Sequence, residues 1–109
     1  MNLEQLIGRL QKTPSFMGNV THWETIPAKE ASFAPFPAEL DNRLPPVLAQ
    51  RGVYKLYSHQ REAFDLAATG KDICVVTPTA SGKTMCYNLP VHNAILKNND
   101  ARALYLFPT

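Results

Sequence analysis

The order strand, loop, helix around residue 80 constrains the fold of this chain more than any other feature of its sequence. Residues 73–76 (Ile-Cys-Val-Val) have the apolar composition of a buried strand. Residues 77–84 (Thr-Pro-Thr-Ala-Ser-Gly-Lys-Thr) follow directly and favour a loop. The apolar spacing after Thr84 then predicts a helix with one buried side, kinked or loosened at Pro90.

A loop of this kind is suited to bind phosphate groups. Small residues at positions 79–82 let consecutive N–H groups turn toward an anion, and the start of the helix adds unpaired N–H groups and the positive end of its dipole. Lys83 can reach the β- and γ-phosphates of a nucleotide, and the Thr84 hydroxyl can ligate Mg²⁺. We therefore predict a site for a nucleoside triphosphate and Mg²⁺, formed by Thr79, Ala80, Ser81, Gly82, Lys83 and Thr84.

The loop departs in two places from the common phosphate-loop pattern. Thr77 stands where the first glycine of G-x-x-x-x-G-K-[ST] belongs. Ala80 occupies a position where many such loops have another glycine, so we expect its backbone to avoid angles that favour glycine. A chance Gly-Lys-Thr in a strand-to-helix turn is the alternative, but the flanking strand and helix supply the context that the motif requires.

A second strand is predicted beyond the helix. Residues 102–107 (Arg-Ala-Leu-Tyr-Leu-Phe) follow a turn at residues 98–100 and are largely apolar. The stretch 73–107 contains 35 residues, which suits one β-α-β unit with a right-handed crossover. We therefore expect an α/β fold with at least two parallel strands.

The residues before the loop predict short helices joined by irregular chain. A helix over residues 1–12 has one apolar face and ends before Pro14. Residues 13–46 hold six of the nine prolines together with several aromatic residues, as in an extended arm anchored on a neighbouring surface. A helix over 38–51 should break or restart near Leu44, because two prolines follow it, and should end at Gly52.

One further helix leads toward the loop. It should begin with Ser58 as the N-cap, bury Ala63 and Phe64 among other residues, and end at residues 69–70 (Thr-Gly). We divide the chain into an N-terminal helical and proline-rich arm, residues 1–52, and the first part of a nucleotide-binding domain, residues 53–109.

Composition and charge exclude several classes of protein. A hydrophobic content of 45% and a charged content of 18% are those of an ordinary globular domain, and no apolar run approaches the roughly 18 residues of a membrane span. We therefore expect a cytoplasmic protein. A net charge of +2 does not indicate a nucleic-acid surface by itself. Both cysteines, Cys74 and Cys86, should be reduced and face the core.

Three segments together resemble a known family. Residues 79–84, preceded by Pro78 and followed by residues 86–90 (Cys-Tyr-Asn-Leu-Pro), resemble the first motif of the superfamily-two DEAD/DEAH-box helicases. With residues 56–60 (Leu-Tyr-Ser-His-Gln) and 103–109 (Ala-Leu-Tyr-Leu-Phe-Pro-Thr), the chain is most similar to the bacterial MrfA/YprA-type DNA helicases. The resemblance implies an incomplete RecA-like P-loop NTPase domain after the N-terminal arm.

The same resemblance implies roles for individual residues. Gln60 stands where these helicases have a glutamine that reads adenine, and a carboxamide can accept from adenine N6 and donate to N7, whereas guanine presents two acceptors there. Tyr57 is expected to stack on the base or line its pocket. Lys83 and Thr84 take the catalytic roles on phosphate and Mg²⁺, and Thr109 contacts the backbone of the nucleic acid.

The resemblance implies the ATP-binding segment of an ATP-dependent helicase that unwinds nucleic acid, with DNA as the expected substrate. The family's acidic motif and its second RecA-like domain lie outside these 109 residues, so we expect the segment alone to be inactive. Two alternatives remain at this stage. The chain could be another P-loop NTPase, a kinase or GTPase, or a non-catalytic interaction module that acts through its proline-rich arm.

Overall fold

The computed structural model describes residues 1–108, in two compact units. The first unit is Met1–Glu30 and contains α1 (Leu3–Gln11) and α2 (Pro14–Met17). Asn2 caps α1, because its side chain accepts from the Gln5 backbone N–H at 2.9 Å while the Gln5 side chain accepts from the Asn2 N–H at 3.1 Å. The helix predicted over residues 1–12 is confirmed. None of its residues is buried within the described structure.

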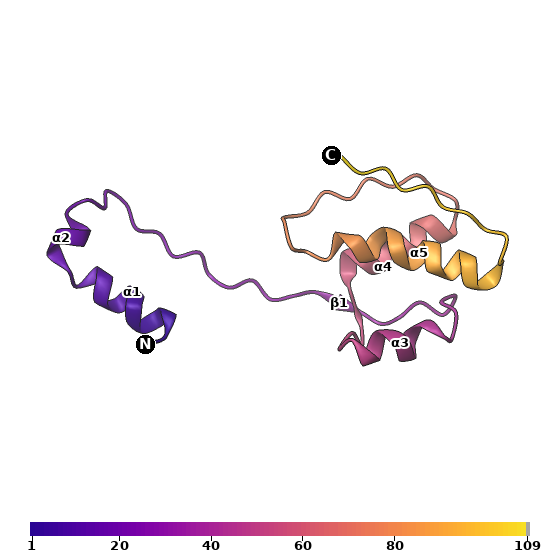
Figure 1. Cartoon of the computed structure of the whole chain (residues 1–109), viewed down its shortest axis with the longest axis horizontal. Helices are drawn as coiled ribbons and strands as arrows, with labels where there is room; N and C mark the ends of the chain where they lie inside the picture. The colour runs from indigo at the N-terminus through magenta and orange to yellow at the C-terminus, as the bar shows by residue number, and fades with distance from the viewer. Residues whose placement is uncertain (109) are drawn as a thin grey trace. The chain divides into compact units, whose positions relative to one another are not determined.

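The second unit begins at Ala31 and holds the other elements (Figure 1). They are β1 (Phe33–Ala34), α3 (Leu44–Gln50), β2 (Leu56–Tyr57), α4 (Ser58–Ala68) and α5 (Lys83–Lys97). β1 and β2 pair antiparallel, with Phe33 opposite Tyr57 and Ala34 opposite Leu56. α4 packs along α5, so the phosphate-loop helix has a helical neighbour.

The structure defines the starts of two predicted helices. α3 begins at Leu44, so the two prolines after it lie in the first turn, where a missing N–H costs nothing. The helix therefore starts near Leu44, which confirms the predicted restart, and residues 38–43 are not helical. In α4 the N-cap is Tyr57, and Ser58, the predicted cap, is the first helical residue.

The core of the second unit combines residues 40–48 of the arm with the two long helices. Leu56, Phe64 and Leu89 are the largest fully buried side chains. Buried leucines of the arm, Leu40, Leu44 and Leu48, complete the same cluster. The hydrophobic contribution of this cluster therefore depends on residues from both sides of position 52.

The predicted parallel β-α-β unit does not appear in the part of the chain that the structure describes. Residues 73–76 and 102–107 are extended, but neither segment is a strand (Figure 1). Strands need a hydrogen-bonded neighbour, and here side chains such as Val76 and Leu104 remain 88% and 84% exposed. The described fold is thus mostly helical, with one small antiparallel sheet.

One of the two cysteines is buried and the other is exposed. Cys86 in α5 is buried as predicted, and burial raises the pKa of its thiol. Cys74 is exposed, so the prediction that it faces the core is wrong. Within residues 1–108, no helix has the length and apolar character to cross a membrane.

Candidate functional site

The loop between residue 76 and α5 contains two residues in the left-handed region. Gly82 is the N-cap of α5 with φ +77° and ψ +28°, and Ala80 has φ +61°. Only glycine enters this region without cost, and other residues lose about 1–2 kcal/mol there. The expectation that Ala80 avoids such angles is therefore wrong, because the tight turn over Ser81 requires the conformation whichever residue stands there.

Lys83 is folded back over its own loop. Its Nζ donates to the carbonyl oxygens of Thr77 at 2.8 Å and Pro78 at 2.9 Å. The Thr77 hydroxyl, at the position of the missing first glycine, is hydrogen-bonded to the Ser81 hydroxyl at 2.5 Å. Thr77 therefore closes the loop across its base, a role that the sequence pattern did not reveal.

Gln60 joins α4 to the end of the phosphate loop. Its side chain is only 6% exposed; Oε1 accepts from the Tyr57 N–H at 2.9 Å, and Nε2 donates to the Gly82 carbonyl at 3.0 Å. A carboxamide has two donor hydrogens and two lone pairs, so one of each remains for a ligand. The structure thus brings Gln60 and the loop together, as their places in the sequence predicted.

Tyr57 takes part in a stack of aromatic rings beside the loop. Its ring stacks on Phe33, with centroids 5.1 Å apart, and on His59, with centroids 5.7 Å apart. His59 Nε2 lies 2.8 Å from the Ser81 carbonyl oxygen. His59 therefore contacts the phosphate loop directly, although sequence reasoning did not select it; its place next to Gln60 was the available signal.

Two cavities adjoin these residues. One, of about 330 Å³, is lined by Phe33, Tyr54, Tyr57, Gln60 and Met85 among others, and its aromatic walls suit a planar base. The other, of about 700 Å³, is lined by Lys83 and Thr84 together with apolar residues from α5 and from both extended segments. The predicted base-reading residues Tyr57 and Gln60 therefore line one cavity, and Lys83 and Thr84 line the other.

The remaining predicted site residues are exposed and accessible. Thr79 and Ala80 lie at the tip of the loop, and Thr84 is exposed in the first turn of α5, where its hydroxyl could reach a metal ion held by phosphate. The described residues contain no cluster of three acidic, histidine or cysteine side chains that could hold a metal alone. Thr109 lies outside the described residues.

Comparison with known proteins shows that this chain is similar to helicases. The family model described as DEAD/DEAH box helicase matches residues 57–109. The chain is 50% identical over 91 residues to the uncharacterized ATP-dependent helicase YprA of Bacillus subtilis, covering 84% of this chain and 12% of that protein. It is 31% identical to the ATP-dependent helicase hrq1 of Schizosaccharomyces pombe, covering 99% of this chain and 10% of that protein.

A solved structure is similar over the whole chain. The DUF1998 helicase MrfA bound to DNA and AMPPNP superposes with a TM-score of 0.89 and 45% identity, covering 100% of this chain and 15% of that one. The chain therefore spans between a tenth and a sixth of the length of these relatives.

Proposed function

Because the chain belongs to the DEAD/DEAH box helicase family, we propose that it is the ATP-binding segment of an ATP-dependent DNA helicase of the MrfA/YprA type. One observation carries the proposal most directly. The buried Gln60 carboxamide is hydrogen-bonded to Gly82, the residue at which the phosphate loop enters α5. A base-reading amide and a phosphate-binding loop are thus held in one rigid contact, as an adenine nucleotide requires.

Each loop residue has a role in this proposal. Backbone N–H groups from Thr79 to Gly82 and the start of α5 surround the β- and γ-phosphates. The Lys83 ammonium leaves the two loop carbonyls for the phosphate oxygens, exchanging two neutral acceptors for charged ones. When Mg²⁺ is bound, the exposed Thr84 hydroxyl would serve as one of its ligands, and the metal would neutralise phosphate charge.

Base recognition uses the neighbouring cavity. The second N–H of Gln60 Nε2 and the second lone pair of Oε1 form hydrogen bonds with the edge of adenine, while Tyr57 lines the pocket. Thr109 contacts the backbone of the bound DNA strand. Guanine is rejected because it offers acceptors at both positions that the amide addresses.

The proposal extends to the surrounding domain. Residues 53–109 form the first part of a RecA-like domain, in which segments 73–76 and 102–107 become parallel strands once neighbouring strands supply hydrogen bonds; residues 1–52 are the arm. Hydrolysis further requires an acidic metal ligand, a group that orients water and an arginine, and a second RecA-like domain whose closure over ATP advances the protein along DNA. These 109 residues alone therefore bind nucleotide without turning it over.

The test is Lys83→Ala, compared with Lys71→Ala, which removes the same charge from an exposed position outside the loop. We expect Lys83→Ala to keep the circular dichroism of the parent chain but to lose ATP binding in a fluorescence titration, and to abolish unwinding when placed in the longer helicase. GTP should compete poorly. Wild-type affinity in Lys83→Ala, or equal competition by GTP, would overturn the assignment.

A further inference from the structure

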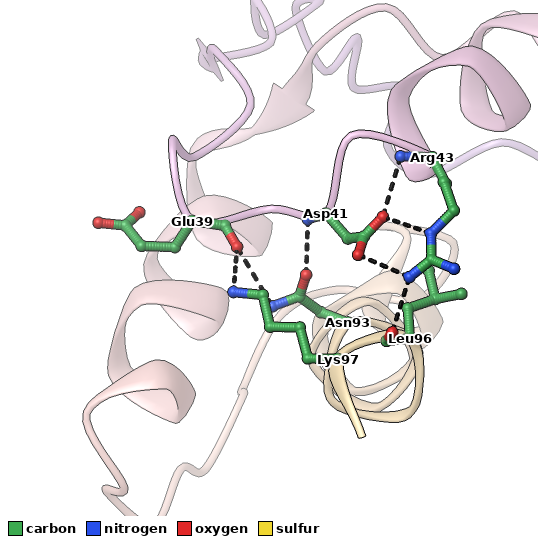
Figure 2. Close-up of polar contacts among 6 residues, drawn as sticks. All are labelled: Glu39, Asp41, Arg43, Asn93, Leu96 and Lys97. Carbon is green, nitrogen blue, oxygen red and sulfur yellow. Dashed lines mark hydrogen bonds and ion pairs between the residues drawn. The ribbon is translucent and has the colours of Figure 1, made fainter. Parts of the chain in front are cut away.

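A polar clamp joins the arm to the far end of the phosphate-loop helix. It consists of Glu39, Asp41 and Arg43 from the arm and Asn93, Leu96 and Lys97 from the last turns of α5 (Figure 2). None of these residues belongs to the nucleotide site. The clamp lies at the opposite end of α5 from Lys83, the first residue of that helix.

Asn93 is the buried member of the clamp. Its side chain is 8% exposed; Oδ1 accepts from the Asp41 N–H at 2.7 Å, and Nδ2 donates to the Glu39 carbonyl at 3.4 Å. Lys97 Nζ donates to the same carbonyl at 2.7 Å. The arm's turn therefore depends on side chains of α5 to satisfy backbone groups that would be costly to leave unpaired.

Arg43 holds the end of the helix from the other side. Its Nη2 donates to the Leu96 carbonyl at 2.7 Å, an oxygen at the helix end that cannot have an intrahelical partner. The same guanidinium is fixed by two hydrogen bonds to the Asp41 carboxylate, at 2.8 Å and 2.9 Å. Arg43 and Lys97 also place positive charge at the negative end of the helix dipole.

We propose that this polar clamp is a positioning device for the phosphate loop, which holds α5 so that Lys83 and Thr84 stay in register with Gln60. The proposal rests on the nucleotide-binding function given above. α5 runs unbroken from residue 83 to 97, so a displacement at one end of the helix is transmitted to the other. Pro90 removes one N–H from the helix ladder, which increases the need for support from outside.

The two ends of α5 lie at similar distances from the point where the helix packs on the core. Leu89 is 1% exposed and shares the core cluster with Phe64, which makes it the natural pivot of α5. At about 1.5 Å per residue, Thr84 lies about 7.5 Å before this pivot and Asn93 about 6 Å after it. A shift of about 1 Å at the clamp therefore moves the phosphate-binding end of α5 by a similar distance.

The experiment uses the intact chain with Asn93→Ala, and Asn88→Ala as the matched control. Both changes replace asparagine by alanine on the same helix, but Asn88 bonds the Tyr105 hydroxyl at 3.0 Å and is not part of the clamp. Two readouts are used: amide hydrogen exchange of residues 77–86 without ligand, and the affinity for AMPPNP with Mg²⁺. Lys97→Ala and Lys97→Arg, at an exposed position, test the same contact without touching the core.

We expect Asn93→Ala to speed exchange at residues 85 and 86, the first amides of α5 with helical hydrogen bonds, and to weaken AMPPNP binding, each by about tenfold, which corresponds to about 1.4 kcal/mol. Asn88→Ala should leave the amide exchange rates and the AMPPNP affinity unchanged. Lys97→Ala should speed exchange and weaken AMPPNP binding, whereas Lys97→Arg should keep both close to the values of the parent chain. The proposal is overturned if folded clamp variants change exchange only at residues 39–43 and 93–98. A wild-type chain that binds no AMPPNP would refute the proposed function instead, while the exchange data would still decide on the clamp.

Discussion

Replacing Gly82 by alanine should be unusually costly for a single methyl group. The residue has φ +77°, and an added Cβ would lie 2.6 Å from Gln60 Nε2, closer than a methyl group and an amide nitrogen can approach. The left-handed conformation costs alanine about 1–2 kcal/mol. Displacing the buried amide from the Gly82 carbonyl adds about 0.5–1.5 kcal/mol for the lost hydrogen bond. We therefore expect Gly82→Ala to lower the free energy of unfolding by about 1.5–3.5 kcal/mol.

Gly52→Ala separates the two contributions. Gly52 has the same φ of +77°, but a Cβ there would meet nothing within 4 Å. This variant should lose only the conformational part, about 1–2 kcal/mol. The difference between the two alanine variants then measures how tightly the phosphate loop is seated on Gln60.

Urea denaturation followed by circular dichroism provides the assay, and the pair Gln60→Ala and Gly82→Ala completes a double-mutant cycle. Once Gln60 is truncated, the added methyl group has room, so the second substitution should cost no more than Gly52→Ala. Gly82→Ala should also weaken ATP binding, whereas Gly52→Ala should not. Equal losses of stability for Gly82→Ala and Gly52→Ala in the wild-type background would show that our account of this contact is wrong.

Two further predictions concern the core and the clamp. Leu89→Ala, at a position 1% exposed, should lower the free energy of unfolding by about 2–5 kcal/mol, whereas Leu104→Ala, at 84% exposure, should change it by less than about 0.5 kcal/mol in the same denaturation assay. The Arg43 guanidinium lowers the pKa of Asp41 from 3.8 to about 2, so the stability that this carboxylate contributes is complete above pH 4 and is lost as the pH falls through 2. NMR titration of the Asp41 carboxyl should find that low pKa, and Arg43→Ala should return it toward 3.8; a value near 3.8 in the parent chain would contradict the clamp geometry.

The local elements of the nucleotide site could be predicted from sequence because their signals are local. Helical spacing of apolar residues marks α4 and α5, and the run of small residues before Lys83 marks the loop between them. The proximity of Gln60 to the loop followed from the order of elements and the family resemblance. Its contact with Gly82, and the presence of His59 in the same site, did not follow, because they depend on side-chain directions across two helices.

Other predictions concern conformations that depend on partners outside the segment itself. Residues 73–76 and 102–107 have strand composition, but strands form only with neighbours to supply hydrogen bonds. Ala80 takes a left-handed angle because the loop must turn sharply before α5, although nothing in its own side chain favours that angle.

The sequence by itself determined that a loop of small residues, one lysine and one threonine stand at the start of a helix, because these signals are local. Only the tertiary structure decided that residues 40–48 of the arm belong to the same core as that helix. The arm's leucines fill the space beside Phe64 and Leu89, and Asn93 pairs with backbone groups about 50 residues earlier. Such contacts between distant segments have no local signature, because burial and hydrogen-bond pairing are properties of the folded chain.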